Sequence, residues 1–116
     1  MRRLLLLTDP PESTWANDLT DALDAFFAVE KRTSRELRQG LEVTGSDLIV
    51  IDATSVGEVP SLIALLRRQD REVPIVVSTA SPTWNQARDA FLAGATDYVH
   101  RSSDPNALVE IFAQFL

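Results

Sequence analysis

The sequence predicts an α/β protein with a five-stranded parallel sheet and helices on both of its faces. Short apolar runs bounded by polar or turn residues recur along the chain, which is typical of strands buried on both faces. Between these runs lie segments whose apolar residues recur every three to four positions, which is typical of amphipathic helices. The strict alternation of the two patterns indicates parallel strands joined by right-handed crossovers.

The predicted strands are short. Three runs are apolar throughout and cover residues 4–7, 48–51 and 75–77, and a weaker run covers residues 98–99. Residues 27–32 are more polar, as in a strand at the edge of a sheet. Numbered along the chain, the strands are expected in the order 2-1-3-4-5, which gives a flavodoxin-like (βα)5 sandwich.

Helices are predicted in the intervening segments. The first covers residues 15–26, where apolar side chains recur at helical spacing, and a weaker second helix covers residues 34–43. The third follows Pro60, a residue that suits a first helical turn. The fourth covers residues 83–93, and Gly94 stands where a left-handed C-terminal cap belongs.

The last helix has a well-defined predicted start. Asp104 is expected to be its N-cap, and Pro105 its first helical residue. Its buried stripe is predicted to consist of Leu108, Ile111, Phe112 and Phe115.

Composition excludes several classes of function. The 116 residues contain no cysteine, which excludes a disulfide scaffold, a Cys-ligated metal site and a thiol nucleophile. The 17 acidic residues outnumber the 11 basic ones, so direct nucleic-acid binding is not expected. The apolar run of residues 4–7 is too short for a signal peptide or a membrane span. We therefore expect a cytoplasmic protein without a membrane partner.

Polar residues follow the predicted strands where the ligands of open α/β sheets bind. They include Asp9, Asp52, Thr79 and Arg101. A carboxylate at the end of a buried strand is costly unless it is paired or bound to a metal, although Asp52 could instead cap the following turn and Asp9 the first helix. Because the first and third strands are expected to be neighbours, the two carboxylates should approach each other. A magnesium ion would relieve their repulsion.

Three segments of the chain resemble response-regulator receiver domains of the CheY-like type. They are residues 47–52 (DLIVID), 73–80 (VPIVVSTA) and 93–99 (AGATDYV), and their spacing also fits the family. The resemblance extends over the whole chain, so residues 1–116 are expected to form one receiver domain.

The resemblance implies roles for individual residues. Asp52 stands where the family places its phosphoacceptor, and Mg²⁺ would be held by Asp9, Asp52 and the backbone carbonyl of Thr54. Thr79 matches the hydroxyl residue that binds the phosphoryl group, and Thr79 and Tyr98 match the pair that switches conformation. A carboxylate can act as a nucleophile toward a phosphoryl group, which agrees with these roles.

The implied function is that of a two-component receiver rather than an enzyme. It would accept a phosphoryl group from a histidine kinase or a phosphotransfer protein and signal through the surface of its fourth helix, fifth strand and fifth helix. An output domain in a longer chain, a downstream partner protein and a homodimer are all compatible with this interpretation.

Two residues depart from the family pattern at the expected site. Thr8 replaces the first acid of the usual pair, and Arg101 replaces the usual lysine. The loss of one carboxylate should weaken Mg²⁺ binding, and a planar guanidinium need not reach the point that an ammonium reaches. The alternative function is therefore a degenerate receiver that acts as a phosphorylation-independent protein-interaction module. A flavin or nucleotide site is disfavoured because the four glycines form no phosphate-binding cluster.

Three other features are predicted to be structural. His100 is expected to point off the last strand without a functional role, and Trp84 to be partly buried at a helix edge rather than an exposed partner anchor. The charged residues between 67 and 72 are expected to form a solvated helix end.

Overall fold

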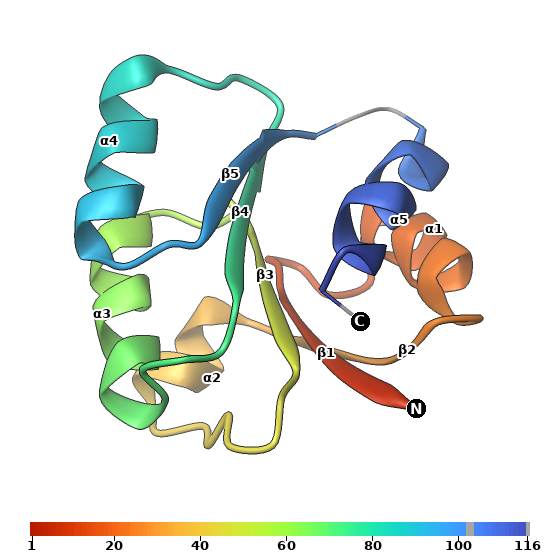
Figure 1. The fold of residues 1–116 in the computed structure, drawn as a ribbon, viewed down its shortest axis with the longest axis horizontal. Coiled ribbons are helices and arrows are strands. Elements are labelled where there is room, and N and C mark those ends of the chain that lie inside the picture. The colour runs from red at the N-terminus through yellow and green to blue at the C-terminus, as the bar shows by residue number, and fades with distance from the viewer. Residues whose placement is uncertain (102–103, 116) are drawn as a thin grey trace.

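The computed structural model describes residues 1–101 and 104–115 and confirms the predicted fold class. A sheet of five parallel strands in the order β2-β1-β3-β4-β5 forms the centre of the molecule (Figure 1). The strands are β1 (Arg2–Leu7), β2 (Phe27–Arg32), β3 (Leu48–Asp52), β4 (Ile75–Thr79) and β5 (Asp97–His100). The helices are α1 (Thr14–Leu23), α2 (Ser34–Arg38), α3 (Val59–Gln69), α4 (Trp84–Ala93) and α5 (Pro105–Ala113).

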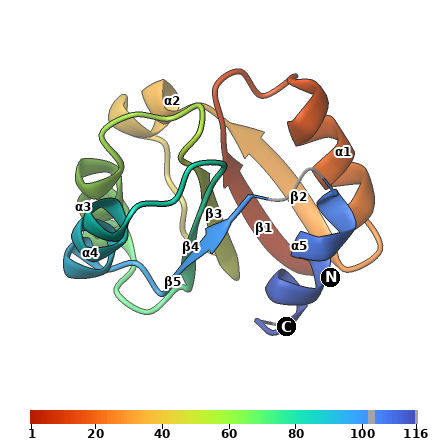
Figure 2. The ribbon, with the colours of Figure 1, turned by 90° about the horizontal axis from the view of Figure 1, so that it is seen from above.

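The helices form a layer on each face of the sheet. Figure 2 shows α2, α3 and α4 on one face and α1 and α5 on the other. This is the doubly wound arrangement expected of alternating strands and helices. All carboxyl ends of the parallel strands therefore meet at one edge of the sheet.

Each face of the sheet has its own apolar core. Leu5 and Leu7 of β1 pack with the residues beneath α3 and α4, whereas Leu4 and Leu6 pack beneath α1 and α5. Successive side chains of a strand point to opposite faces, so a strand that is buried on both faces needs an unbroken apolar run. Phe112 of α5 is completely buried in the second core.

The predicted C-cap of α4 and the predicted N-cap of α5 are both confirmed. Thr83 is the N-cap of α4 and its hydroxyl accepts a hydrogen bond from Gln86 N. Gly94 ends the same helix at φ 119°, a conformation that favours glycine. Asp104 is the N-cap of α5, as predicted, and Pro105 is its first residue.

Two predicted helices are too long. The second ends at Arg38 rather than at residue 43, because the chain turns at Gly40 (φ 106°). The first ends at Leu23, so Phe26 lies in the turn before β2 and is 44% exposed. In both segments the connection to the next strand overrides the local apolar spacing. None of the helices in residues 1–101 and 104–115 is long and apolar enough to cross a membrane.

Candidate functional site

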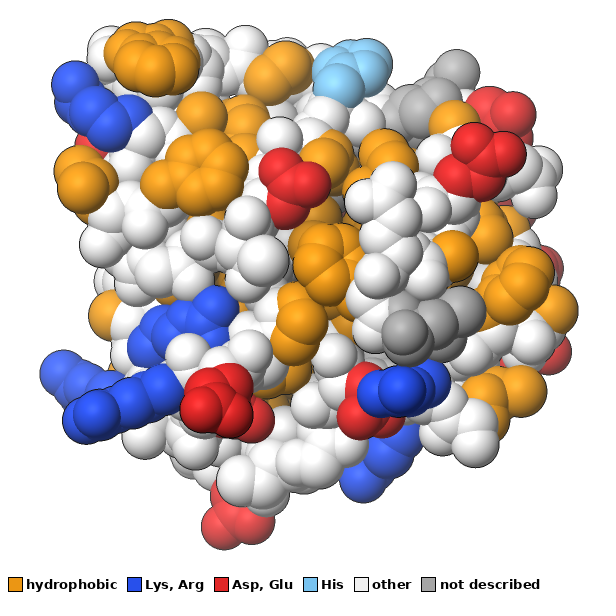
Figure 3. Space-filling view, in the orientation of Figure 1, with side chains coloured by type: hydrophobic (Ala, Val, Ile, Leu, Met, Phe, Trp, Pro, Cys, Tyr) orange, Lys and Arg blue, Asp and Glu red, His pale blue; other side chains and the backbone are white. Residues whose placement is uncertain are grey.

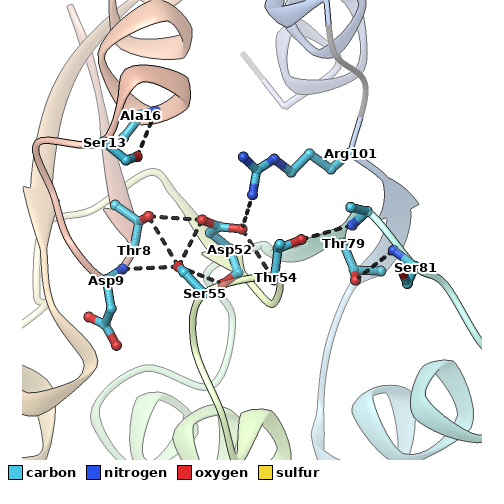
Figure 4. Close-up of polar contacts among 11 residues, drawn as sticks. Thr8, Asp9, Ser13, Ala16, Asp52, Thr54, Ser55, Thr79, Ser81 and Arg101 are labelled. Atoms are coloured by element: carbon cyan, nitrogen blue, oxygen red, sulfur yellow. Dashed lines mark hydrogen bonds and ion pairs between the residues drawn. The ribbon is translucent and has the colours of Figure 1, made fainter.

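A polar cluster lies at the carboxyl edge of the sheet, where β1, β3 and β5 end. Thr8 follows β1, Asp52 is the last residue of β3 and Arg101 follows β5 (Figure 4). Register places β1 and β3 side by side, with Leu7 opposite Ile51, so Thr8 stands beside Asp52. The sequence had predicted that these three side chains would share this edge.

The Asp52 carboxylate is buried, with 2% of the residue exposed, and hydrogen-bonded at both oxygens. Its Oδ2 atom accepts from the Thr8 hydroxyl at 2.9 Å and from the Ser55 hydroxyl at 2.8 Å. Its Oδ1 atom accepts from the backbone N–H of Thr54 and from the Arg101 guanidinium, both at 3.2 Å. A buried carboxylate is tolerated only when it is paired and hydrogen-bonded, and both conditions hold here.

Arg101 neutralises this charge from the opposite side. Its side chain is 21% exposed and forms an ion pair with Asp52. Its guanidinium carbon lies 4.0 Å from the centroid of the Trp15 ring, so the cation is stacked on an aromatic face of α1. Stacking and ion pairing use the planar shape of the guanidinium, which an ammonium lacks.

Ser55 is a member of the cluster that the sequence analysis missed. Its hydroxyl donates to Asp52 and also accepts a hydrogen bond from the backbone N–H of Asp9 at 3.0 Å. The available signal was its position, three residues after a buried aspartate in the turn that follows a strand. Serine side chains often form hydrogen bonds within such turns.

Asp9 does not approach Asp52, contrary to the expectation. Its carboxylate accepts hydrogen bonds from the backbone N–H of Ser34 at 3.1 Å and from the Ser34 hydroxyl at 2.7 Å. In Figure 4 the side chain points away from Asp52. The first N–H groups of α2 have no partner within the helix, and Asp9 satisfies one of them. The alternative role of capping α1 falls instead to Ser13, whose hydroxyl accepts from Ala16 N.

Thr54 and Thr79 lie in the loops after β3 and at the end of β4. The Thr54 hydroxyl accepts from the backbone N–H of Ala80 at 2.9 Å, which ties the two loops together. The buried Thr79 hydroxyl accepts from the backbone N–H of Ser81 at 3.3 Å. Tyr98 is half-buried on β5, and its hydroxyl donates to Gln86 Oε1 of α4 at 3.4 Å. The predicted switch residues therefore connect β4 and β5 to the loops and to α4.

A magnesium ion does not fit this arrangement of the side chains. Within the described part of the chain, no group of three or more His, Cys, Asp or Glu residues could hold a metal ion. Mg²⁺ requires acceptor oxygens. The oxygens of Asp52 already face two hydroxyls, a backbone N–H and a guanidinium, and the Asp9 carboxylate is held by Ser34.

The outer face of α4 carries exposed apolar side chains. Trp84 and Leu92 are each 79% exposed and Phe91 is 48% exposed, whereas Ala90 is the fully buried residue of this helix. Hydrophobic side chains accordingly gather over α4 in Figure 3. The prediction that Trp84 is partly buried is wrong, because only a narrow stripe of α4 faces the sheet. Exposed apolar side chains that cluster in this way mark interaction surfaces.

Arg67 also differs from the prediction of a solvated helix end. Its guanidinium donates to the carbonyl oxygens of Gly94 at 2.8 and 2.9 Å and of Val73 at 2.7 Å. It therefore joins the end of α3 to the turn between α4 and β5. His100, the last residue of β5, is exposed.

Comparisons with known proteins identify the fold. No protein-family model matches the chain, and no curated protein sequence matches it. It is similar to the structure of an orphan response regulator of H. pylori, with a TM-score of 0.83 and 19% identity over 99% of this chain and 96% of that one. A response regulator from Burkholderia multivorans is 27% identical with a TM-score of 0.72, over 98% of this chain and 94% of that one.

A third similar structure is that of an atypical orphan response regulator described as having a phosphorylation-independent regulatory mechanism. Its TM-score is 0.77 and its identity 20%, over 100% of this chain and 95% of that chain. Other similar structures include a CheY-like receiver domain from Methanospirillum hungatei, with a TM-score of 0.82 and 18% identity over 98% of this chain and 92% of that one.

Proposed function

Because the chain has the fold of CheY-like response-regulator receiver domains, we propose that residues 1–116 form a signalling receiver that works without phosphoryl transfer. It binds a partner protein through the side of the molecule that contains α4 and β5, and it is not an enzyme. This is the degenerate-receiver alternative of the sequence analysis, and the state of the Asp52 carboxylate carries the proposal.

Phosphorylation of an aspartate requires a carboxylate oxygen with a free lone pair in line with the phosphorus atom. Asp52 is 2% exposed, and each of its oxygens accepts two hydrogen bonds. The attacking oxygen would have to give up at least one of these bonds. The metal that would neutralise the transferring group has no ligand set here, since Thr8 is a hydroxyl and Asp9 is bound to Ser34.

The exposed face of α4 supplies the interaction surface. Trp84, Phe91 and Leu92 offer large, exposed apolar side chains that belong to neither core. Aromatic side chains on such faces are the usual anchors of protein interfaces. The atypical orphan regulator that resembles this chain offers a precedent for signalling without phosphorylation.

The first experiment tests phosphoryl transfer directly. The purified protein is incubated with acetyl phosphate and Mg²⁺, beside a receiver that is known to be phosphorylated, and both are analysed by intact mass spectrometry. We expect the phosphoryl adduct on the control receiver alone. An adduct on this chain that disappears in Asp52→Asn would refute the proposal.

The second experiment tests the surface. A partner cross-linked to the protein in cells should be retained by Asp52→Asn and lost from Leu92→Glu, which places a charge on the exposed face of α4. Asp18→Asn, on the exposed side of α1, is the matched control and should retain the partner. Loss of the partner from Asp52→Asn with retention by Leu92→Glu would contradict the proposed surface.

Phosphoryl acceptance on Asp52 from a histidine kinase or a phosphotransfer protein is the second candidate. One observation favours it. Asp52 ends β3 at the carboxyl edge of the sheet, where the Arg101 cation lies 3.2 Å from its Oδ1 atom and Thr79 ends the neighbouring strand. In that case the acetyl phosphate experiment gives a magnesium-dependent adduct on Asp52.

A further inference from the structure

A cavity of about 260 Å³ lies between α4, β5 and the loop from β3 to α3, apart from the Asp52 cluster. Its inner wall is apolar and includes the buried side chains of Val56, Val77 and Ala90. An engineered apolar cavity of about 150 Å³ is enough to bind benzene. This cavity therefore has room for one ring and a short chain.

The rim of the cavity is acidic and aromatic. Glu58 and Asp89 line it together with Gln86 and Tyr98, and no Lys, Arg or His lines it among the described residues. Glu58 pairs with Arg38 at 3.2 Å and Asp89 with Arg88 at 3.5 Å, but all four side chains are more than one-third exposed. Exposed pairs of this kind are weak, so both carboxylates can be attracted to a further cation.

The backbone at Glu58 gives independent support for a binding role. Glu58 adopts the left-handed conformation (φ 55°, ψ 44°) at the N-cap of α3, and its side chain makes no capping hydrogen bond. A non-glycine residue in this region is strained, and such strain is concentrated at ligand clamps and active sites. The strained turn places Glu58 at the wall of the cavity, and its carboxylate does not cap the helix but pairs with Arg38.

We propose that this cavity binds a small organic cation, a primary ammonium compound whose apolar body is about the size of one aromatic ring. The apolar body contacts Val77 and Ala90, and the ammonium group lies at the rim, attracted by Glu58 and Asp89 and by the Tyr98 ring. Because α4 supplies part of the wall, a bound ligand contacts the helix that carries the exposed apolar face. This gives the receiver an input that does not involve Asp52.

The test uses a matched pair of probes, 2-phenylethylamine and 2-phenylethanol, which differ in charge but hardly in size. Each is titrated into the isotope-labelled protein at pH 7 while backbone amide shifts are followed by NMR. We expect saturable shifts at Val77 and Ala90 with the amine, and about fivefold weaker binding of the alcohol.

Substitutions then locate the binding site. Asp89→Asn should weaken binding of the amine about fivefold, whereas Asp21→Asn on the exposed surface of α1 should leave it unchanged. Ala90→Leu fills the cavity from α4 and should abolish binding. Gly57 lines the cavity from the loop side, a Cβ atom there meets nothing within 4 Å and its φ is not left-handed, so Gly57→Val adds bulk at the cavity wall and should weaken binding.

Four results would overturn the inference. One is equal binding of the amine and the alcohol, and another is shifts confined to residues outside the cavity. The third is unchanged amine binding in Gly57→Val or in a folded Ala90→Leu. The absence of saturable shifts with the amine counts equally against it. All of these measurements are made without a phosphodonor, so their failure is distinct from a failure of the proposed function.

Discussion

Removal of the Thr8 hydroxyl is the most direct test of how Asp52 is stabilised. Thr8 is completely buried, and its hydroxyl donates to Asp52 Oδ2 at 2.9 Å. Thr8→Val keeps the size and shape of the side chain and removes this donor together with the longer contact of the Thr8 hydroxyl with the Ser55 hydroxyl at 3.3 Å. Ser55 then remains as the one hydroxyl on Oδ2, at 2.8 Å.

The expected loss follows from the charge of the acceptor. A hydrogen bond to a charged group contributes about 1.5–3 kcal/mol, and the added methyl group recovers a fraction of this by apolar burial. We therefore expect the free energy of unfolding to fall by about 2 kcal/mol. For 116 residues, at about 2.1 cal/mol/K of unfolding entropy per residue, this corresponds to a decrease in Tm of about 8 °C.

The assay is thermal and urea unfolding followed by circular dichroism at pH 7. Thr20→Val is the matched control, because the Thr20 hydroxyl donates to an uncharged acceptor, the carbonyl of Ala16, at 2.7 Å in α1. That variant should change the free energy of unfolding by less than about 0.5 kcal/mol. If Thr8→Val changes stability no more than Thr20→Val, the Asp52 cluster does not hold its charge as described.

Three further predictions concern the turns around α3 and α4. Backbone N–H groups of Glu72 and Val73 hold the pKa of the Asp70 carboxyl below its usual value. Asp70→Asn should therefore lower the free energy of unfolding by about 1 kcal/mol above pH 4. In urea unfolding, the difference between Asp70→Asn and the unchanged protein should shrink as the pH falls through the pKa of the folded state. Gly94→Ala places a Cβ atom 3.0 Å from Arg67 Cγ at φ 119° and should lower the unfolding free energy by about 1–2 kcal/mol in the same assay; an unchanged value would contradict the left-handed cap. Arg67→Met removes the donors to the Gly94 and Val73 carbonyls, so hydrogen exchange in β5 should accelerate, while unchanged protection would show that this link is dispensable.

Most of the fold could be predicted because burial on both faces leaves a strong signal. Residues 48–51 are apolar without exception, and all of β3 is buried. The errors lie where a local pattern competes with the path of the chain. Phe26 continues the apolar spacing of α1, but β2 begins at Phe27, so the helix must end before it.

The site was predictable as a set of positions but not as a set of contacts. Sheet topology alone brings Thr8, Asp52 and Arg101 to one edge. The direction of the Asp9 side chain depends on donors that a later segment supplies, namely the N–H and hydroxyl groups of Ser34. Such partners are 25 residues apart and leave no local trace in the sequence. The contact of Arg67 with Gly94 likewise joins residues that are far apart in the sequence, 27 positions in this case.

Thr8 and Arg101, the two residues that the sequence resemblance marks as atypical, are best understood as one electrostatic arrangement. Asp52 is nearly inaccessible to solvent, so its charge must be balanced by neighbouring groups. A second carboxylate at position 8 would add a negative charge beside it, and repulsion would then call for a divalent ion. A hydroxyl adds a donor without a charge, and a single guanidinium fixed on Trp15 then suffices to neutralise Asp52. The Asp52 cluster stays neutral and hydrogen-bonded without a metal, and this allows the fold to persist when, as we propose, its carboxylate no longer serves phosphoryl transfer.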